Sequence, residues 1–303
     1  MDMLSFRNMA VRCCTRILMW RGAPIFPILG GISLIALAEV TRSMAVNEGH
    51  CDVPGSLFPS PQQTWWRDTM CGVYAGSSNA TVRIAFPAIS PATRLPPERW
   101  VWTLGVYATC AFCFLPASLI ARRMFQCMRH QHDNEDRRYA FVFALLVIAL
   151  VCLVGEASVP LQGDILDATS IELCTFVHLM FAGALFMSLG LHGQLVIKMQ
   201  CQASRAGRRS ISLFSLRLKV LLACFSALSC FGLIPAVLLM ACPQSVCDPR
   251  ACMDNLGGLA QRCVVAGLAL GLASYGLDFW AMQPSFAADP RVALGQMEVQ
   301  LRN

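Results

Sequence analysis

The stretch Tyr139–Val159, YAFVFALLVIALVCLVGEASV, decides the fold, because it carries one charged residue, Glu156, among otherwise apolar or small side chains. A helix rises about 1.5 Å per residue, so about 20 such residues cross a hydrocarbon core of about 30 Å. The stretch is therefore predicted to be a membrane-spanning helix.

Five more segments of similar length and composition flank it: Ala23–Thr41, Trp100–Ala121, Leu173–Ile197, Val220–Cys242 and Leu256–Trp280. The first is long for a cleaved signal peptide and lacks a small-x-small cleavage site, which favours an anchor. Only 14% of the 303 residues are charged, against about a quarter in soluble domains. The sequence predicts an all-α, polytopic membrane protein with a bundle of six transmembrane helices.

Arginine and lysine are concentrated in residues 1–22 and in the connections 122–138 and 198–219, whereas the other connections are poorer in them. The positive-inside rule then puts both termini in the cytosol. Residues 1–22 become a cytosolic segment, 23–280 the transmembrane domain with a lumenal loop at 42–99, and 281–303 a cytosolic tail. The net charge of +6 lies between apolar runs and forms no single basic face, which argues against a nucleic-acid partner.

The predicted lumenal loops carry sites for modification. Asn79-Ala80-Thr81 is an N-glycosylation sequon in the long loop. Cys51, Cys247 and Cys252 would face an oxidising compartment, where a bridge between the first and last loops and free thiols are both compatible with the sequence. His130 and His132 lack further ligands at ordered spacing, so we expect a polar cytosolic turn there and no metal.

Four ionisable groups near the lumenal ends of spans are candidates for a lipid-headgroup site: Glu156, Glu172, His178 and Arg262. If the fourth and sixth helices adjoin, these groups line one polar cavity in which Arg262 holds a phosphate. The alternative is structural: the acids meet interfacial water, His178 makes one interhelical hydrogen bond, and Arg262 pairs with a carboxylate. Known catalytic motifs are missing, so the sequence identifies no nucleophile.

Several short motifs resemble a known family. His50-Cys51-Asp52-Val53-Pro54 is similar to its His-Cys-x-Val-Pro in the first lumenal loop, and Arg99-Trp100-Val101-Trp102 is similar to its entry to the second span. Glu172 and Asp278-Phe279 are placed like the acidic motifs of its fourth and sixth spans. The family contains the post-GPI-attachment remodelling factors (FGF-receptor-activating proteins), the damage-regulated autophagy modulators and the N-terminal domain of CWH-type yeast cell-wall proteins.

The resemblance implies that Cys247 or Cys252 stands for a family cysteine of the last loop. It implies a role in remodelling the lipid of GPI anchors in the Golgi or endoplasmic reticulum, where lyso-GPI is reacylated. The partners would be membrane lipid and GPI-anchored proteins, with no cofactor; whether the chain itself transfers the acyl group is left open. The alternatives are a non-catalytic, autophagy-modulator-like protein of lysosomes or endosomes, and a small transporter or receptor.

Overall fold

A computed structural model describes residues 22, 24–48, 53–54, 73–75, 81–83, 88–129, 136–161, 172–205, 213–230 and 249–288 of the chain. Nearly all of the described residues are helical. The helices are α2 (Ile25–Glu48), α4 (Ile89–Ala92), α5 (Glu98–Thr109), the π-helical turn η1 (Cys110–Phe114), α6 (Leu115–Arg129), α7 (Asp136–Ser158), α8 (Leu173–Arg205), α9 (Leu213–Leu228), α11 (Pro249–Ala273) and α12 (Tyr275–Ala288).

Five helical segments of the described chain are long and apolar enough to cross a membrane. They are Ile25–Glu48, Glu98–Arg122, Arg138–Ser158, Leu173–Gln202 and Gly257–Ala281. They correspond to five of the six predicted spans. The first half of the remaining predicted span, Val220–Cys242, belongs to α9 and its helical continuation to Cys230. The second half of that span lies outside the described residues. Six spans and the position of the termini therefore stay predictions.

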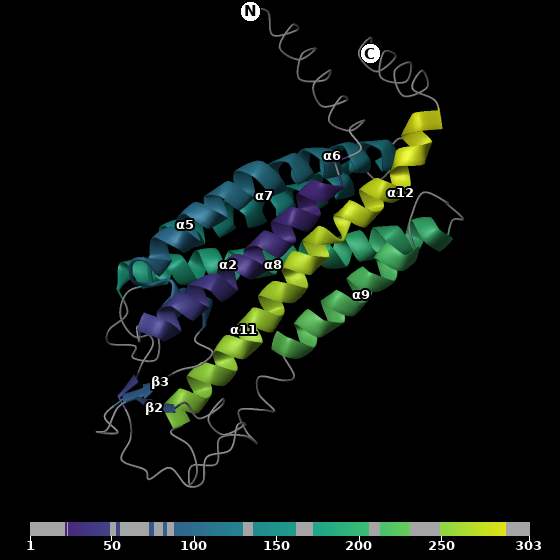
Figure 1. Cartoon of the computed structure of the whole chain (residues 1–303). Coiled ribbons are helices and arrows are strands. Elements are labelled where there is room, and N and C mark those ends of the chain that lie inside the picture. The colour runs from purple at the N-terminus through teal and green to yellow at the C-terminus, as the bar shows by residue number, and fades with distance from the viewer. Residues whose placement is uncertain are drawn as a thin grey trace, which may run out of the picture.

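The long helices lie alongside one another in a bundle, with α7 packed on α8 and α2 packed on α5 and α11 (Figure 1). Helix α2 begins and α12 ends at one end of the bundle. At the other end, called the loop end here, α2 ends while α5 and α11 begin. Helix α2 thus occupies the centre of the bundle, with contacts to α4, α5, η1, α6, α11 and α12.

Apolar side chains cover the outside of the bundle as well as its interior. Phe112 and Met187 are 73% and 67% exposed, and large apolar residues on every long helix share this orientation. The buried residues include many polar ones, among them Thr41, His178, His192 and Asp278. A water-soluble protein would expose few contiguous apolar patches of this kind. The outer surface of the bundle is therefore suited to contact with the acyl chains of lipids.

Part of the predicted loop 42–99 has structure of its own. Helix α2 continues to Glu48, supported by an exposed pair between Arg42 Nε and Glu39 Oε2 at 2.7 Å. The strands β1 (Val53–Pro54), β2 (Val73–Ala75) and β3 (Thr81–Arg83) form an antiparallel sheet in the order β1-β3-β2. The expectation of an all-α chain therefore holds for the bundle, and the loop adds a small sheet.

Candidate functional site

The short helix α4 is inserted into the loop end of the bundle, where it contacts α2 and α11. Its residues Ile89 and Ser90 are buried. The backbone N–H of Ile89 donates to Gln261 Oε1 of α11 at 2.8 Å, and Thr93 Oγ1 donates to the Ile89 carbonyl at 3.0 Å. A helix this short gains little from its own hydrogen bonds. These two contacts and its burial therefore fix the position of Ser90.

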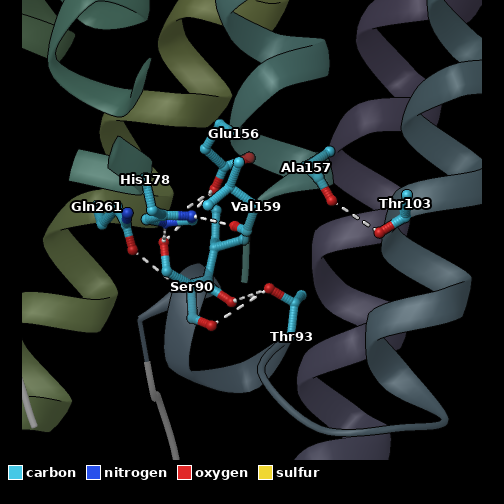
Figure 2. A network of polar contacts seen from close by, with 9 residues as sticks. Ser90, Thr93, Thr103, Glu156, Ala157, Val159, His178 and Gln261 are labelled. Atoms are coloured by element: carbon cyan, nitrogen blue, oxygen red, sulfur yellow. Dashed lines mark hydrogen bonds and ion pairs between the residues drawn. The ribbon is translucent and has the colours of Figure 1, made fainter. Parts of the chain in front are cut away.

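Ser90 meets two side chains from neighbouring helices, as Figure 2 shows. His178 Nε2 of α8 lies 2.8 Å from Ser90 Oγ. Glu156 Oε1 of α7 lies 3.5 Å from His178 Nε2 and 3.5 Å from Ser90 Oγ. All three side chains are at least nine-tenths buried. Three helices, α4, α7 and α8, thus bring a hydroxyl, an imidazole and a carboxyl group together.

The contact of the other ring nitrogen, Nδ1, determines which nitrogen of His178 carries the proton. His178 Nδ1 lies 2.8 Å from the carbonyl oxygen of Val159. A carbonyl can only accept a hydrogen bond, so Nδ1 must carry the proton. In neutral imidazole, Nε2 is then an acceptor, and Ser90 Oγ donates to it. Ser90 Oγ also lies 3.5 Å from Glu156 Oε1, and this longer contact is weaker than the one with His178.

An apolar cavity with about 670 Å³ of empty space, its open mouth included, adjoins this cluster. Most of its lining is aliphatic and comes from α2, α7, α8 and α11. Glu156, Gln261 and Trp102 supply its polar atoms. Ligand sites in proteins are typically lined mostly by apolar side chains, with a few polar groups. The cavity fits that description.

Two polar atoms on the lining have no hydrogen-bond partner within the described part of the chain: Glu156 Oε2 and Trp102 Nε1. The indole nitrogen of Trp102 lies close to the Glu156 carboxyl group, near enough for the two groups to interact with each other. Buried polar atoms are nearly always satisfied, and the exceptions call for a missing partner. One atom is an acceptor and the other a donor, so a single hydroxyl group satisfies both.

The structure brings together two of the four predicted headgroup residues, Glu156 and His178. Arg262 instead donates from Nη1 to Glu39 Oε1 at 2.9 Å and to the Ala38 carbonyl at 3.1 Å, both on α2. Glu172 is exposed at the start of α8. Arg262 therefore joins α11 to α2, in the carboxylate-paired arrangement that the sequence left open as an alternative.

The motif residues Trp100, Asp278 and Phe279 lie apart from this cluster. Trp100 is exposed on α5, and Phe279 is buried in α12. Asp278 Oδ2, in the first turn of α12, accepts from Lys219 Nζ at 2.6 Å and from Gln200 Nε2 at 3.0 Å. The prediction placed Lys219 at the edge of a cytosolic connection, whereas it lies inside α9. Its buried ion pair with Asp278 explains why a lysine is tolerated there.

The remaining predicted sites fall largely outside the described residues. These are His50, the cysteines Cys51, Cys247 and Cys252, the sequon residue Asn79, and the histidines His130 and His132. Pro54 belongs to β1, of which the backbone is described. Within the described ranges, no group of three or more His, Cys, Asp or Glu residues is placed to hold a metal ion.

Sequence reasoning missed Ser90, because Ile89–Ala92 carries no periodic pattern or catalytic motif. It also missed Glu39 as the partner of Arg262, which is 223 residues distant. The dipeptide Ser90-Pro91 before the second span is a turn signal, but it does not predict insertion between helices.

The apolar surface and the five long helices define the class of protein: the chain is an integral, multi-pass membrane protein. Comparison with protein-family models, curated proteins and solved structures finds no significant match. Any narrower function must therefore be argued from the cluster and the cavity.

Proposed function

We propose that the protein binds a membrane lipid in the apolar cavity, and that it serves in remodelling the lipid of GPI anchors in the Golgi or endoplasmic reticulum. The observation that carries the proposal is the composition of the cavity, which is mostly aliphatic, with Glu156, Trp102 and Gln261 as its polar residues. An acyl chain fits the aliphatic part of the cavity, and the polar backbone of a lipid fits the part that these three residues line.

The polar atoms supply the selectivity. Inside a bilayer, an acyl chain gains little by moving from lipid into an equally apolar cavity. In this proposal, the free energy of specific binding comes from Glu156 Oε2 and Trp102 Nε1, which have no hydrogen-bond partner among the described residues. A hydroxyl group on the lipid backbone donates to the first and accepts from the second. A lysolipid carries such a hydroxyl beside its remaining acyl chain.

The GPI assignment rests on the resemblance of the motifs around Cys51, Trp100 and Asp278 to the remodelling-factor family. A lyso-GPI lipid combines the acyl chain and the free hydroxyl that the cavity favours. Under the predicted topology, the loop end faces the lumen, where GPI anchors are displayed. The substrate would then enter from the lumenal leaflet.

The test compares the lipids of GPI anchors, by mass spectrometry, in cells with and without the gene. Ala182 lines the cavity, and Ala182→Phe should fill it, whereas Met187→Phe changes a lipid-facing residue of the same helix. We expect altered anchor lipids in the deletion strain, rescue by wild type and Met187→Phe, and no rescue by Ala182→Phe. Unaltered anchor lipids after deletion would overturn the GPI assignment.

Binding itself is tested on purified protein in nanodiscs with a photoactivatable lysophospholipid. We expect crosslinking to peptides of α7, α8 or α11 in the wild type and its loss in Ala182→Phe. Equal crosslinking of the two proteins at these helices would contradict a lipid in the cavity.

A further inference from the structure

We infer that Ser90 is a nucleophile and His178 its general base, so that this site transfers an acyl group through a covalent acyl-Ser90. The inference rests on the proposed lipid site and adds a reaction to it. It concerns a residue that carries no sequence motif and is brought to His178 by the placement of α4 alone.

The contact between Ser90 and His178 has the geometry of an activated nucleophile. Ser90 Oγ donates to His178 Nε2 at 2.8 Å, within the reach needed for proton transfer. The Val159 carbonyl holds Nδ1–H at 2.8 Å and fixes the tautomer. A third group that orients the base is the recurring feature of hydroxyl nucleophiles on unrelated folds. Here a backbone carbonyl takes that part.

Glu156 is a positioning residue in this arrangement. Its Oε1 lies 3.5 Å from His178 Nε2 and from Ser90 Oγ. A carboxylate at that distance stabilises the positive charge that forms on the imidazole when it takes the proton. Glu156 also lines the cavity, and its Oε2 has no hydrogen-bond partner in the described chain, so a lipid hydroxyl bound to this carboxyl group would lie close to Ser90.

The reaction has two balanced steps. In the first, Ser90 Oγ attacks the ester carbonyl of a phospholipid donor while its proton passes to His178 Nε2. The ester bond breaks, the departing lysophospholipid oxygen takes the proton from His178, and acyl-Ser90 remains. In the second, the hydroxyl of the acceptor lysolipid attacks acyl-Ser90 and gives its proton to His178. The proton returns to Ser90 Oγ as the new ester leaves.

The cavity keeps the intermediate productive. Its lining is mostly apolar, so water competes poorly with the acceptor hydroxyl for acyl-Ser90. Ile89, next to Ser90, lines the cavity together with Glu156. The proposed acyl chain on Ser90 would therefore extend into this cavity, between α7, α8 and α11.

The first experiment treats the full chain in phosphatidylcholine nanodiscs with a fluorophosphonate probe, which phosphonylates activated serines. We expect labelling at Ser90, identified by peptide mass spectrometry, and its loss in Ser90→Ala. His178→Gln keeps a polar side chain but removes the base, and it should slow labelling by about 10²–10⁴-fold. Ser118→Ala is the matched control, because Ser118 is a buried membrane serine whose hydroxyl donates to the Phe114 carbonyl at 2.7 Å.

A second measurement covers the case in which Ser90→Ala does not fold. Ser90→Cys is close in size, and it should accumulate an acyl thioester that neutral hydroxylamine releases. Either labelling that persists unchanged in Ser90→Ala, or a Ser90→Cys protein that holds no acyl group, would overturn the inference. If one of these results is found while Ser90→Ala still crosslinks the photoactivatable lysophospholipid, the lipid site is supported and only the covalent step is contradicted.

Discussion

At the scale of single residues, the bundle buries several charged and polar side chains within an apolar interior and exposes further apolar side chains on its outer surface. Lys219 and Asp278 are both buried, with a 2.6 Å contact between Nζ and Oδ2. Lys219 Nζ also donates to Ser215 Oγ at 2.6 Å and lies 5.2 Å from the centre of the Tyr275 ring. A buried charge is tolerated only when it is paired and hydrogen-bonded, so this cluster should be a main determinant of how α9 meets α12.

Lys219→Met should lower the free energy of unfolding by about 3–5 kcal/mol, because it leaves the Asp278 carboxylate buried without its cation. Thermal unfolding in detergent measures the effect. The matched control is Lys198→Met, which changes the other lysine of the chain, an exposed one. The double variant Lys219→Met with Asp278→Leu should recover much of the loss. A double variant as unstable as Lys219→Met alone would contradict the explanation.

Tyr275→Phe should cost about 1–3 kcal/mol, because it strands a buried acceptor. His192 Nδ1 is held by the Val142 carbonyl at 2.9 Å, so Nε2 accepts from the Tyr275 hydroxyl at 2.7 Å. Tyr107→Phe is the control, since Tyr107 is 40% exposed and also hydrogen-bonded, to Ser158 Oγ at 2.7 Å. The same unfolding assay compares the two, and an equal loss in both would count against burial as the cause.

At the scale of elements, close approach of backbones holds α2 against α11. A Cβ added to Gly31 would meet the carbonyl oxygen of Ala269 at 2.5 Å and the Cβ of Ala273 at 3.0 Å. Small residues let membrane helices pack by van der Waals contact where no hydrophobic driving force acts between them. The Arg262–Glu39 pair joins the same two helices near the loop end.

Gly31→Leu should force α2 and α11 apart and destabilise the fold, because the obstruction is backbone and cannot rotate away. Gly183→Leu is the matched control, since a Cβ on Gly183 of α8 meets nothing within 4 Å. Yield and size-exclusion profile of the detergent-purified variants provide the measurement. Similar behaviour of the two variants would mean that the α2–α11 contact is looser than the structure has it.

At the scale of the whole molecule, the predicted topology makes one prediction independent of any lipid. If the loop 42–99 is lumenal, Asn79 should carry an N-linked glycan, and glycosidase treatment should increase the electrophoretic mobility of the protein. Asn79→Gln should show the same mobility without treatment. An epitope inserted in this loop can be tested in cells whose plasma membrane alone is permeabilised. If an antibody labels the epitope from the cytosol, the predicted topology is wrong.

The sequence identified the helices better than the site. Long apolar runs predicted Tyr139–Val159 as a span, and the structure has α7 over nearly the same residues. Glu156 and His178 were singled out because ionisable groups are costly in lipid. Ile89 and Gln261 were not connected, because the contact between α4 and α11 joins residues 172 apart in the chain and no local pattern predicts such a pairing.

By itself, the sequence determined that lipid is the solvent of this chain, because apolar runs of this length cannot be covered in water. Only the tertiary structure decided which buried polar groups meet. It pairs Arg262 with Glu39 and Lys219 with Asp278, and it brings Ser90 next to His178 and Glu156. The physical reason is that the cost of burying a polar group is set by its own chemistry, whereas the partner that offsets this cost is set by helix packing over long sequence separations.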